Sequence, residues 1–235
     1  MKQRGTRFGG KAAWLCLFFF ACACVSLFYT GMRSSGGLAP QSVWRMNNPG
    51  FAPFWKASDI PESGKVTFSP DWQINEGGIE LLPGQPMTGA TFDAGKWKSA
   101  LIPVTRYSIE FEAMRVEGND FFGTVTFPVN DSHVSLVIGG WGGTLVGISC
   151  IDDMDASENN TRGNAYFENN RWHKVRIEVR DDELKAWIND KLFVNVSTKG
   201  HKLGMRLGDI EKCVPFGFAS YATHARIREV IIRKL

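Results

Sequence analysis

The stretch that decides the fold runs from Arg171 to Val196 and reads RWHKVRIEVRDDELKAWINDKLFVNV. Apolar and polar residues alternate in three consecutive segments of it, 175–179, 184–188 and 192–196. Alternation with period two is typical of β-strands with one buried face. The pair Asn189-Asp190 tolerates the positive φ of a tight hairpin turn. Antiparallel strands joined by short turns build a sandwich or a barrel, not a parallel sheet covered by helices.

The same signals recur along the chain, with turn residues between them. Further candidate strands are 65–68, 71–74, 78–82, 107–114, 121–127, 133–138, 144–148, 216–220 and 225–233. Because helical periodicity is nearly absent, we expect an all-β sandwich of two antiparallel sheets.

Composition and charge exclude several function classes. The 235 residues suffice for one sandwich of normal size, and the net charge is only +3. Four of the cations, Lys2, Arg4, Arg7 and Lys11, precede the first apolar run, so the rest is near neutral and offers no basic stripe for nucleic acid. No phosphate-binding loop, Rossmann glycine pattern or Gly-x-Ser-x-Gly elbow occurs, which argues against nucleotide use and serine-triad hydrolysis.

The N-terminus carries an apolar segment, Ala12 to Met32, that holds no charged residue. It fits either a cleaved signal peptide or an uncleaved signal anchor that spans the membrane as one helix. The poor match to a small-x-small cleavage site at its end favours the anchor, and a lipoprotein processed at Cys22 is a third alternative. With the cations on its N-terminal side, we expect a membrane-anchored or secreted protein whose domain lies on the extracytoplasmic side.

The chain therefore divides into a signal or anchor (1–32), a flexible Gly/Ser/Pro/Asn-rich linker (33–53) and one sandwich domain (54–235). Cys150 and Cys213 lie in the exported domain, where disulfides can form. A Cys150–Cys213 bridge and two buried free thiols both fit this placement.

Several segments together resemble a known family. They are Trp72–Leu81 (WQINEGGIEL), Tyr107–Glu112 (YSIEFE), Trp172–Ile177 (WHKVRI), Leu184–Asp190 (LKAWIND), Pro215–Ala219 (PFGFA) and Ile227–Arg233 (IREVIIR). In this order they resemble the 3-keto-disaccharide hydrolase domain, a concanavalin-like jelly roll, and more distantly laminin-G domains. The resemblance spans Lys65 to Leu235 and points to a subgroup of exported bacterial proteins. The sequence departs from the family at Glu117-Gly-Asn-Asp-Phe121, where a Gly-Asn-Ser-Gly turn is common.

The resemblance implies action on sugars that are oxidised at C3. A C3 ketone acidifies the proton on C2, so a base can remove it and the group at C1 can leave. Such a site needs a base, an electrophile for the enolate and a proton donor for the leaving oxygen.

An acidic loop offers carboxylates for this chemistry: Asp152, Asp153, Asp155 and Glu158. We expect Asp153 or Asp155 to act as the base, Glu158 to contact substrate, and Asp152 with Asp155 to offer ligands to Ca²⁺, the only cofactor that the sequence suggests. A solvated acidic loop held by Asx turns explains the same residues without a site.

Three further residues complete the candidate site. His133, at the start of a strand, is a histidine that could serve as the base, and Arg171 is a candidate cation. Trp141, in Gly-Gly-Trp-Gly-Gly, either stacks on a sugar or folds over the end of the sandwich.

Two functions stay open, an enzyme on 3-keto-glycosides or disaccharides and a non-catalytic carbohydrate or cell-surface binding module of laminin-G type. An enzyme predicts a pocket in which His133 or a carboxylate of the acidic loop meets Trp141 and an arginine such as Arg171. A binding module predicts exposed aromatic side chains without a recessed base. A structural envelope protein that retains only the sandwich is a third alternative.

Overall fold

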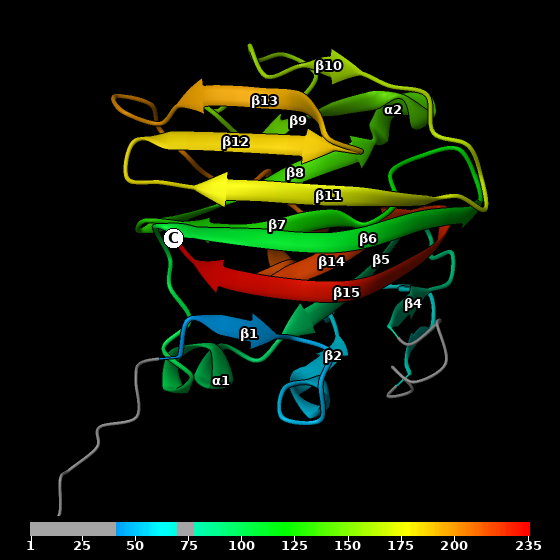
Figure 1. Ribbon diagram of the computed structural model, residues 1–235. Helices are drawn as coiled ribbons and strands as arrows, with labels where there is room; N and C mark the ends of the chain where they lie inside the picture. Colours follow the sequence, from blue (N-terminus) through cyan, green and yellow to red (C-terminus); the bar gives the residue numbers. More distant parts are fainter. Residues whose placement is uncertain (1–40, 70–77) are drawn as a thin grey trace, which may run out of the picture. The chain divides into compact units, whose positions relative to one another are not determined.

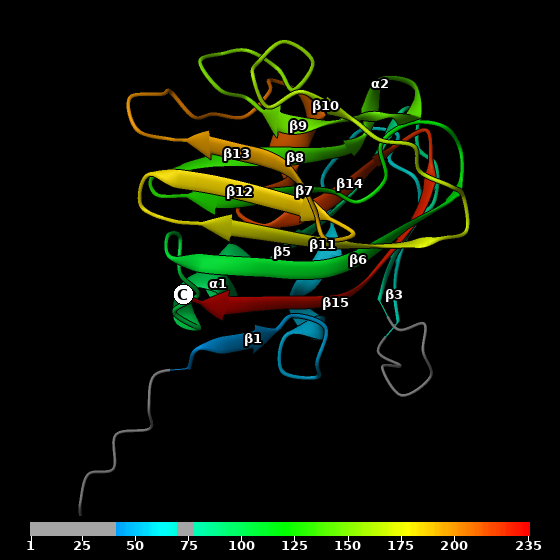
Figure 2. The same cartoon turned by 45° about the horizontal axis from the view of Figure 1, so that its top comes forward.

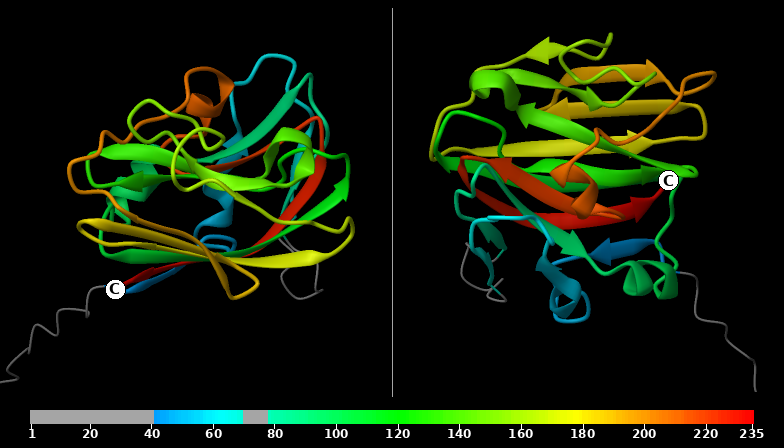
Figure 3. Two further views of the ribbon diagram at one scale, coloured as in Figure 1. Left: turned by 90° about the horizontal axis from the view of Figure 1, so that it is seen from above. Right: turned by 180° about the vertical axis from the view of Figure 1, so that it is seen from behind.

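The computed structural model describes residues 41–69 and 78–235, which belong to one compact unit, Pro40–Leu235. Two antiparallel β-sheets pack face to face in this unit (Figure 1), and Figure 2 and the left view of Figure 3 show both layers. The all-β fold with two antiparallel sheets, predicted from the alternating segments, is confirmed.

The 8-stranded sheet, here sheet A, has the order β13 (Lys191–Ser197), β12 (Glu183–Ile188), β11 (Trp172–Val179), β6 (Tyr107–Glu117), β15 (His224–Lys234), β4 (Ile79–Leu81) and β3 (Val66–Phe68), and β1 (Val43–Arg45) also pairs with β15. The 7-stranded sheet, here sheet B, has the order β10 (Gly163–Asn164), β9 (Leu145–Ser149), β8 (Ser132–Gly139), β7 (Thr124–Val129), β14 (Gly217–Tyr221), β5 (Met87–Phe92) and β2 (Trp55–Ala57).

The predicted alternation sets which side chains enter the core. In β11, Val175, Ile177 and Val179 are buried, and they stand opposite Phe111, Ile109 and Tyr107 of β6. The hairpin from β12 to β13 turns at Asn189 and Asp190, whose φ angles are 49° and 65°. Both residues take the left-handed conformation that Asn and Asp tolerate best, as the sequence predicts.

The boundary predicted between linker and domain is wrong. Residues 33–53 read as a linker, but Val43–Arg45 forms β1, with Val43 opposite Arg233 in β15. Trp44 is 1% exposed, and its indole N–H donates to the carbonyl oxygen of Ala100 at 3.1 Å. The domain therefore includes residues well before position 54, because their apolar side chains complete the core.

Short helical segments connect the strands: η1 (Ala52–Phe54), α1 (Ala94–Ser99), α2 (Gly140–Gly143) and η2 (Asp209–Cys213). Asp93 caps α1, since its carboxylate accepts a hydrogen bond from the backbone N–H of Lys96 at 2.8 Å. The apolar segment Ala12–Met32 and the candidate strand 71–74 lie outside the described residues. Among the residues described, no helix has the length and apolar character needed to span a membrane.

The Cys150–Cys213 disulfide is not formed. Both residues carry free, buried thiols. The Cys213 sulfur lies 3.6 Å from the hydroxyl of Ser58, and the Cys150 sulfur lies 3.3 Å from the hydroxyl of Ser149. Of the two alternatives that the sequence left open, the structure therefore shows the free thiols.

Candidate functional site: a pocket on the outer face of sheet B

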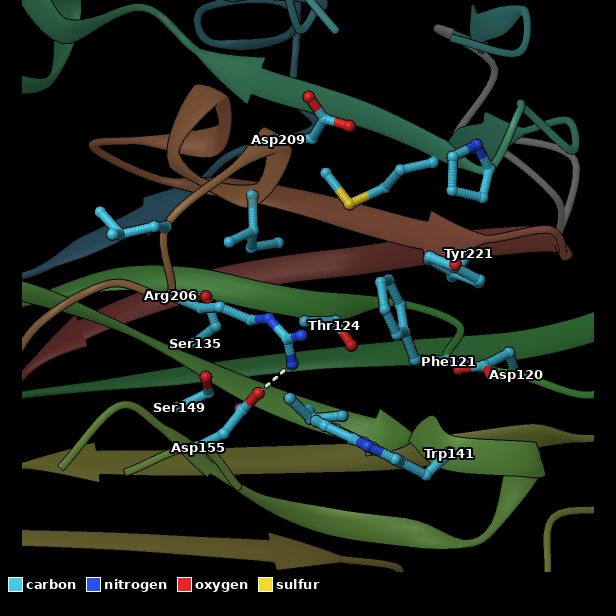
Figure 4. A pocket seen from close by; sticks show the side chains of 15 residues that line it. Asp120, Phe121, Thr124, Ser135, Trp141, Ser149, Asp155, Arg206, Asp209 and Tyr221 are labelled. Atoms are coloured by element: carbon cyan, nitrogen blue, oxygen red, sulfur yellow. Dashed lines mark hydrogen bonds and ion pairs between the residues drawn. The ribbon is translucent and has the colours of Figure 1, made fainter. Parts of the chain in front are cut away.

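A pocket of about 340 Å³ opens on the face of sheet B that points away from sheet A. The side chains of β8 alternate between the two faces of the sheet, and Val134, Leu136 and Ile138 enter the core between the sheets. Ser135 and Val137 alternate with them and line the pocket instead. The full lining comprises Pro86, Met87, Asp120, Phe121, Thr124, Ser135, Val137, Trp141, Ser149, Asp155, Arg206, Leu207, Asp209, Ile210 and Tyr221 (Figure 4).

One side of the pocket is built by the segment that leaves β13 and crosses to η2. Backbone hydrogen bonds hold this segment to the acidic loop, with Cys150 N–H donating to Gly204 O at 2.7 Å and Asp152 N–H to Lys202 O at 2.7 Å. Two residues beyond Gly204, the guanidinium of Arg206 forms an ion pair with the Asp155 carboxylate (Figure 4). The crossing segment thus brings a cation to the acidic loop.

Asp155 is fixed from several sides. Its side chain is only 12% exposed, whereas that of Arg206 is 58% exposed. The carboxylate also accepts a hydrogen bond from the backbone N–H of Ala156 at 2.7 Å. The backbone N–H of Asp155 in turn donates to Glu158 Oε2 at 3.2 Å. A carboxylate held by these bonds keeps one orientation at the pocket surface.

Trp141 forms part of the pocket wall. It sits in α2 with φ 48° and ψ 57°, a left-handed conformation, and the residue is 47% exposed. The backbone N–H of Gly142 donates to Asp120 Oδ2 at 3.3 Å. Behind the turn, the buried guanidinium of Arg115 lies 3.5 Å from the carbonyl oxygen of Gly143. Polar contacts on both sides therefore hold Trp141 toward the pocket.

Two more aromatic rings lie beside the carboxylate of Asp120. The ring centroids of Phe121 and Tyr221 are 5.6 Å apart, and Tyr221 N–H donates to Phe121 O at 3.1 Å. The hydroxyls of Thr124, Ser135 and Ser149 also line the pocket. Apolar rings next to hydroxyls and carboxylates suit a ligand that has apolar faces and polar edges.

Among the sequence-predicted site residues, Asp155 and Trp141 meet in this pocket, and the guanidinium of Arg206 lies 5.7 Å from the Trp141 ring. Asp153 is outside the lining, since its side chain is 74% exposed and pairs with Lys202 at 2.8 Å. Glu158 is also outside it, and its carboxylate accepts a hydrogen bond from the backbone of its own loop, from Asp155 N–H.

The predicted Ca²⁺ site does not fit the arrangement. Asp152 pairs with His201 at 2.6 Å and accepts a hydrogen bond from Lys202 N–H at 2.8 Å, and these bonds hold the pKa of its carboxyl below the usual value. Asp155 is bound to Arg206 instead. In residues 41–69 and 78–235, no three His, Cys, Asp or Glu side chains converge as metal ligands would.

His133 and Arg171 do not reach the pocket lining. His133 shares the outer face of β8 with Ser135, and burial lowers the pKa of its imidazole. Arg171 pairs with Glu168 at 3.7 Å, and its side chain is 65% exposed. The arginine that meets Trp141 and the acidic loop in this pocket is therefore Arg206, and Arg171 is not among the residues that line it.

Sequence reasoning missed five charged or aromatic lining residues, Arg206, Asp209, Asp120, Phe121 and Tyr221. Arg206 and Asp155 are 51 residues apart, and no local spacing links them. Asp120 lies in the Glu117–Phe121 stretch that departs from the family pattern. The departure from the family turn was noted in the sequence, but it was not read as part of a site.

Comparisons with known proteins agree with this fold. Domain 4 of AbnA, a GH43 extracellular arabinanase from Geobacillus stearothermophilus solved with arabinotriose, shares 13% identity at a TM-score of 0.50 and covers 82% of this chain and 91% of its own. Crh5 transglycosylase in complex with NAG shares 11% identity at a TM-score of 0.51 and covers 83% of this chain and 84% of its own. At these identities the likeness shows the fold alone.

A search of curated proteins found no match. The family profile described as 3-keto-alpha-glucoside-1,2-lyase-like domain matches residues 104–233, more than half of the chain. This stretch contributes most of the pocket lining, including Asp120, Trp141, Asp155, Arg206 and Tyr221. The resemblance inferred from the strand and turn segments is confirmed, and the chain belongs to the 3-keto-alpha-glucoside-1,2-lyase-like domain family, a family of carbohydrate-active domains.

Proposed function

We propose that this domain cleaves 3-keto-glycosides or 3-keto-disaccharides in the pocket of sheet B. The observation that carries the proposal is the meeting of Asp155, Arg206 and Trp141 in one lining. A carboxylate of the acidic loop, an arginine and Trp141 are the combination that the sequence analysis required of an enzyme. Family membership supports the same substrate class.

The reaction proceeds by elimination and then hydration. A base takes the C2 proton, and the electrons of the C2–H bond form an enolate with the C3 ketone. The enolate collapses to a C1–C2 double bond as the bond from C1 to the leaving oxygen breaks, and that oxygen takes up a proton. Water then adds to C1 while C2 regains a proton, so the net change is hydrolysis.

Asp155 is the base in this proposal, and Arg206 stabilises the oxygen at C3. A guanidinium supplies hydrogen bonds and positive charge to an enolate oxygen, and such stabilisation is often the largest contribution to catalysis. When Asp155 has taken the C2 proton, it can return that proton to the leaving oxygen. Trp141 gives the sugar an apolar face to stack on.

A second candidate function is a carbohydrate-binding module. It is favoured by two exposed aromatic residues, Trp141 and Tyr221, which are 47% and 40% exposed, and by a described lining that contains no histidine. Carbohydrate is the ligand in both cases. From the apolar segment Ala12–Met32, we also propose that the domain works on the extracytoplasmic side, anchored or secreted.

The deciding experiment measures product release from a 3-keto-disaccharide, with the unoxidised disaccharide as control and with Ca²⁺ or EDTA added in parallel. We expect cleavage of the keto sugar alone. Asp155→Asn should abolish the cleavage, whereas Asp153→Asn, in the same loop but outside the lining, should leave it intact. Equal cleavage of both sugars would contradict the C2-proton mechanism. Binding of the sugars without cleavage would contradict the enzyme and support the second candidate function, a carbohydrate-binding module.

A further inference from the structure

We propose that the pocket selects glycosides without negative charge and that Asp209 is the residue that determines this specificity. The inference rests on the proposed function in one respect only, because it assumes that this pocket receives a carbohydrate. It adds the charge class of the ligand, which the mechanism of cleavage leaves open.

Four ionisable acid or guanidinium groups line the pocket: Asp120, Asp155, Asp209 and Arg206. Three are carboxylates, and the only guanidinium among them already forms an ion pair with Asp155. Because this pair is close to neutral as a unit, the charges that remain in the lining are those of Asp120 and Asp209, and Asp120 also interacts with the guanidinium of Arg115 behind it.

The two remaining carboxylates differ in how far the protein satisfies them. Asp120 accepts hydrogen bonds from the backbone N–H groups of Phe121 at 2.7 Å and Gly142 at 3.3 Å. Asp209 begins η2 directly after Gly208, whose φ is 122°. Among the described residues, no side chain forms an ion pair or hydrogen bond with the Asp209 carboxylate, so its charge stays available to a ligand.

Asp209 lies across the pocket from Asp155 and Trp141 (Figure 4). A sugar stacked on Trp141 with its reacting carbons near Asp155 would therefore turn another edge toward Asp209. At separations of several ångströms in a half-open pocket, one such charge changes ligand affinity roughly fivefold. A carboxylate on the ligand is repelled, a hydroxyl is accepted, and an ammonium group is attracted.

The test uses three probes that differ only at C6: methyl glucoside, methyl 6-amino-6-deoxyglucoside and methyl glucuronide. Their dissociation constants for the full-length protein are measured by calorimetry at low and at high salt. We expect the amine to bind tightest and the glucuronide weakest, with roughly fivefold steps that shrink at high salt. Asp209→Asn should remove the discrimination, and Asp153→Asn, the matched exposed carboxylate outside the lining, should preserve it.

The outcomes separate this inference from the proposed function. Equal binding of all three probes, or an unchanged order in folded Asp209→Asn, overturns the charge selection and leaves the carbohydrate pocket standing. Tighter binding of the glucuronide also overturns it, because that result would mean that the ligand displaces Asp155 from Arg206. Failure of all three probes to bind also overturns the charge selection, whereas the proposed function stands or falls on cleavage of the 3-keto-disaccharide.

Discussion

Arg206 and Asp155 form an ion pair that joins the segment crossing from β13 to η2 with the acidic loop after β9. Asp155 is the buried partner and Arg206 the exposed one, with side-chain exposures of 12% and 58%. A ligand can therefore reach the guanidinium without disturbing the carboxylate's bond to Ala156. This pair gives the pocket an acid–base group and a cation side by side.

Replacing the guanidinium should impair catalysis more than stability. We expect Arg206→Met to lower kcat on a 3-keto-disaccharide by roughly 10²- to 10³-fold, the cost of removing one donor to a developing oxyanion. Arg171→Met is the control, because Arg171 is exposed and, within the described part of the chain, forms an ion pair with Glu168 alone. Initial rates and melting temperatures of both variants check this, and equal rates in the two would refute the role of Arg206.

Arg115 should act on ligand binding through Trp141. Its Nε donates to Asn169 Oδ1 at 2.7 Å, it also bonds the carbonyl oxygen of Phe167, and it is 6% exposed. Arg115→Met leaves buried acceptors without donors, so we expect a loss of about 1–3 kcal/mol in the free energy of unfolding. Arg176→Met, on the outer face of sheet A, should cost roughly 0.5 kcal/mol or less.

A double-mutant cycle separates the effect on Trp141 from the loss of stability. Trp141→Ala should weaken glycan affinity roughly three- to tenfold, the value of one aromatic contact. If Arg115 works by holding the Gly140–Gly143 turn, Arg115→Met adds little to the affinity loss of Trp141→Ala. Fully additive losses in the dissociation constant would instead show that Arg115 does not act through this ring.

Both thiols of the domain should be unreactive until it unfolds. Burial raises the pKa of the Cys213 thiol to about 11, and burial also raises the pKa of Cys150. The thiolate is the reactive form, so a disulfide reagent at pH 8 should label neither residue in the native state. In a chain with Cys16, Cys22 and Cys24 replaced by serine, two thiols should appear in denaturant. Finding no reactive thiol in denaturant would indicate a disulfide between Cys150 and Cys213.

Acid should remove one local contribution to stability. Burial acts to raise the pKa of Glu80, but hydrogen bonds from His224 and Arg226, both at 2.9 Å, outweigh it and hold this pKa below 4.5. The pKa of Glu80 is lower in the folded protein than in the unfolded chain. The ionised carboxylate of Glu80 therefore stabilises the fold fully at pH values above the pKa of the unfolded chain. This contribution to stability disappears as the pH falls through the pKa that Glu80 has in the folded protein.

Thermal unfolding between pH 3 and pH 6 checks this expectation. The melting temperatures of the wild type and of Glu80→Gln should differ most near pH 6 and converge toward pH 3. A difference that stays constant over this range would mean that Glu80 contributes nothing through its charge.

The alternation of apolar and polar residues predicted the strands of the fold whose two faces differ. In β11 and β12 one face meets the core and the other meets solvent, so apolar and polar residues alternate. The strand β5 (Met87–Phe92), with the core on one side and η2 on the other, was missed: all six of its residues are buried, so no alternation marks it, whereas β7 and β9, also fully buried, were found as apolar runs bounded by turn residues. Alternation cannot appear in a strand that is covered on both faces.

The pocket was only partly predictable for a related reason. Asp155 and Trp141 stood out because a cluster of acids and a ring among glycines are unusual over a short stretch. Arg206 and Asp209 lie in a segment without periodicity and reach the pocket only because backbone bonds such as that from Cys150 N–H to Gly204 O place it there. Contacts of this kind depend on the tertiary fold, which local spacing does not encode.

The central place of β15 has a consequence for truncated forms of the protein. This strand, His224–Lys234, has 11 residues, and it pairs with β6, β4 and β1. Without it sheet A cannot close, and the edges of β6 and β4 stay open. Open strand edges are sites of aggregation. A premature stop codon shortly before His224 would therefore remove the strand that joins the two halves of the sheet, and the shortened chain would aggregate rather than fold.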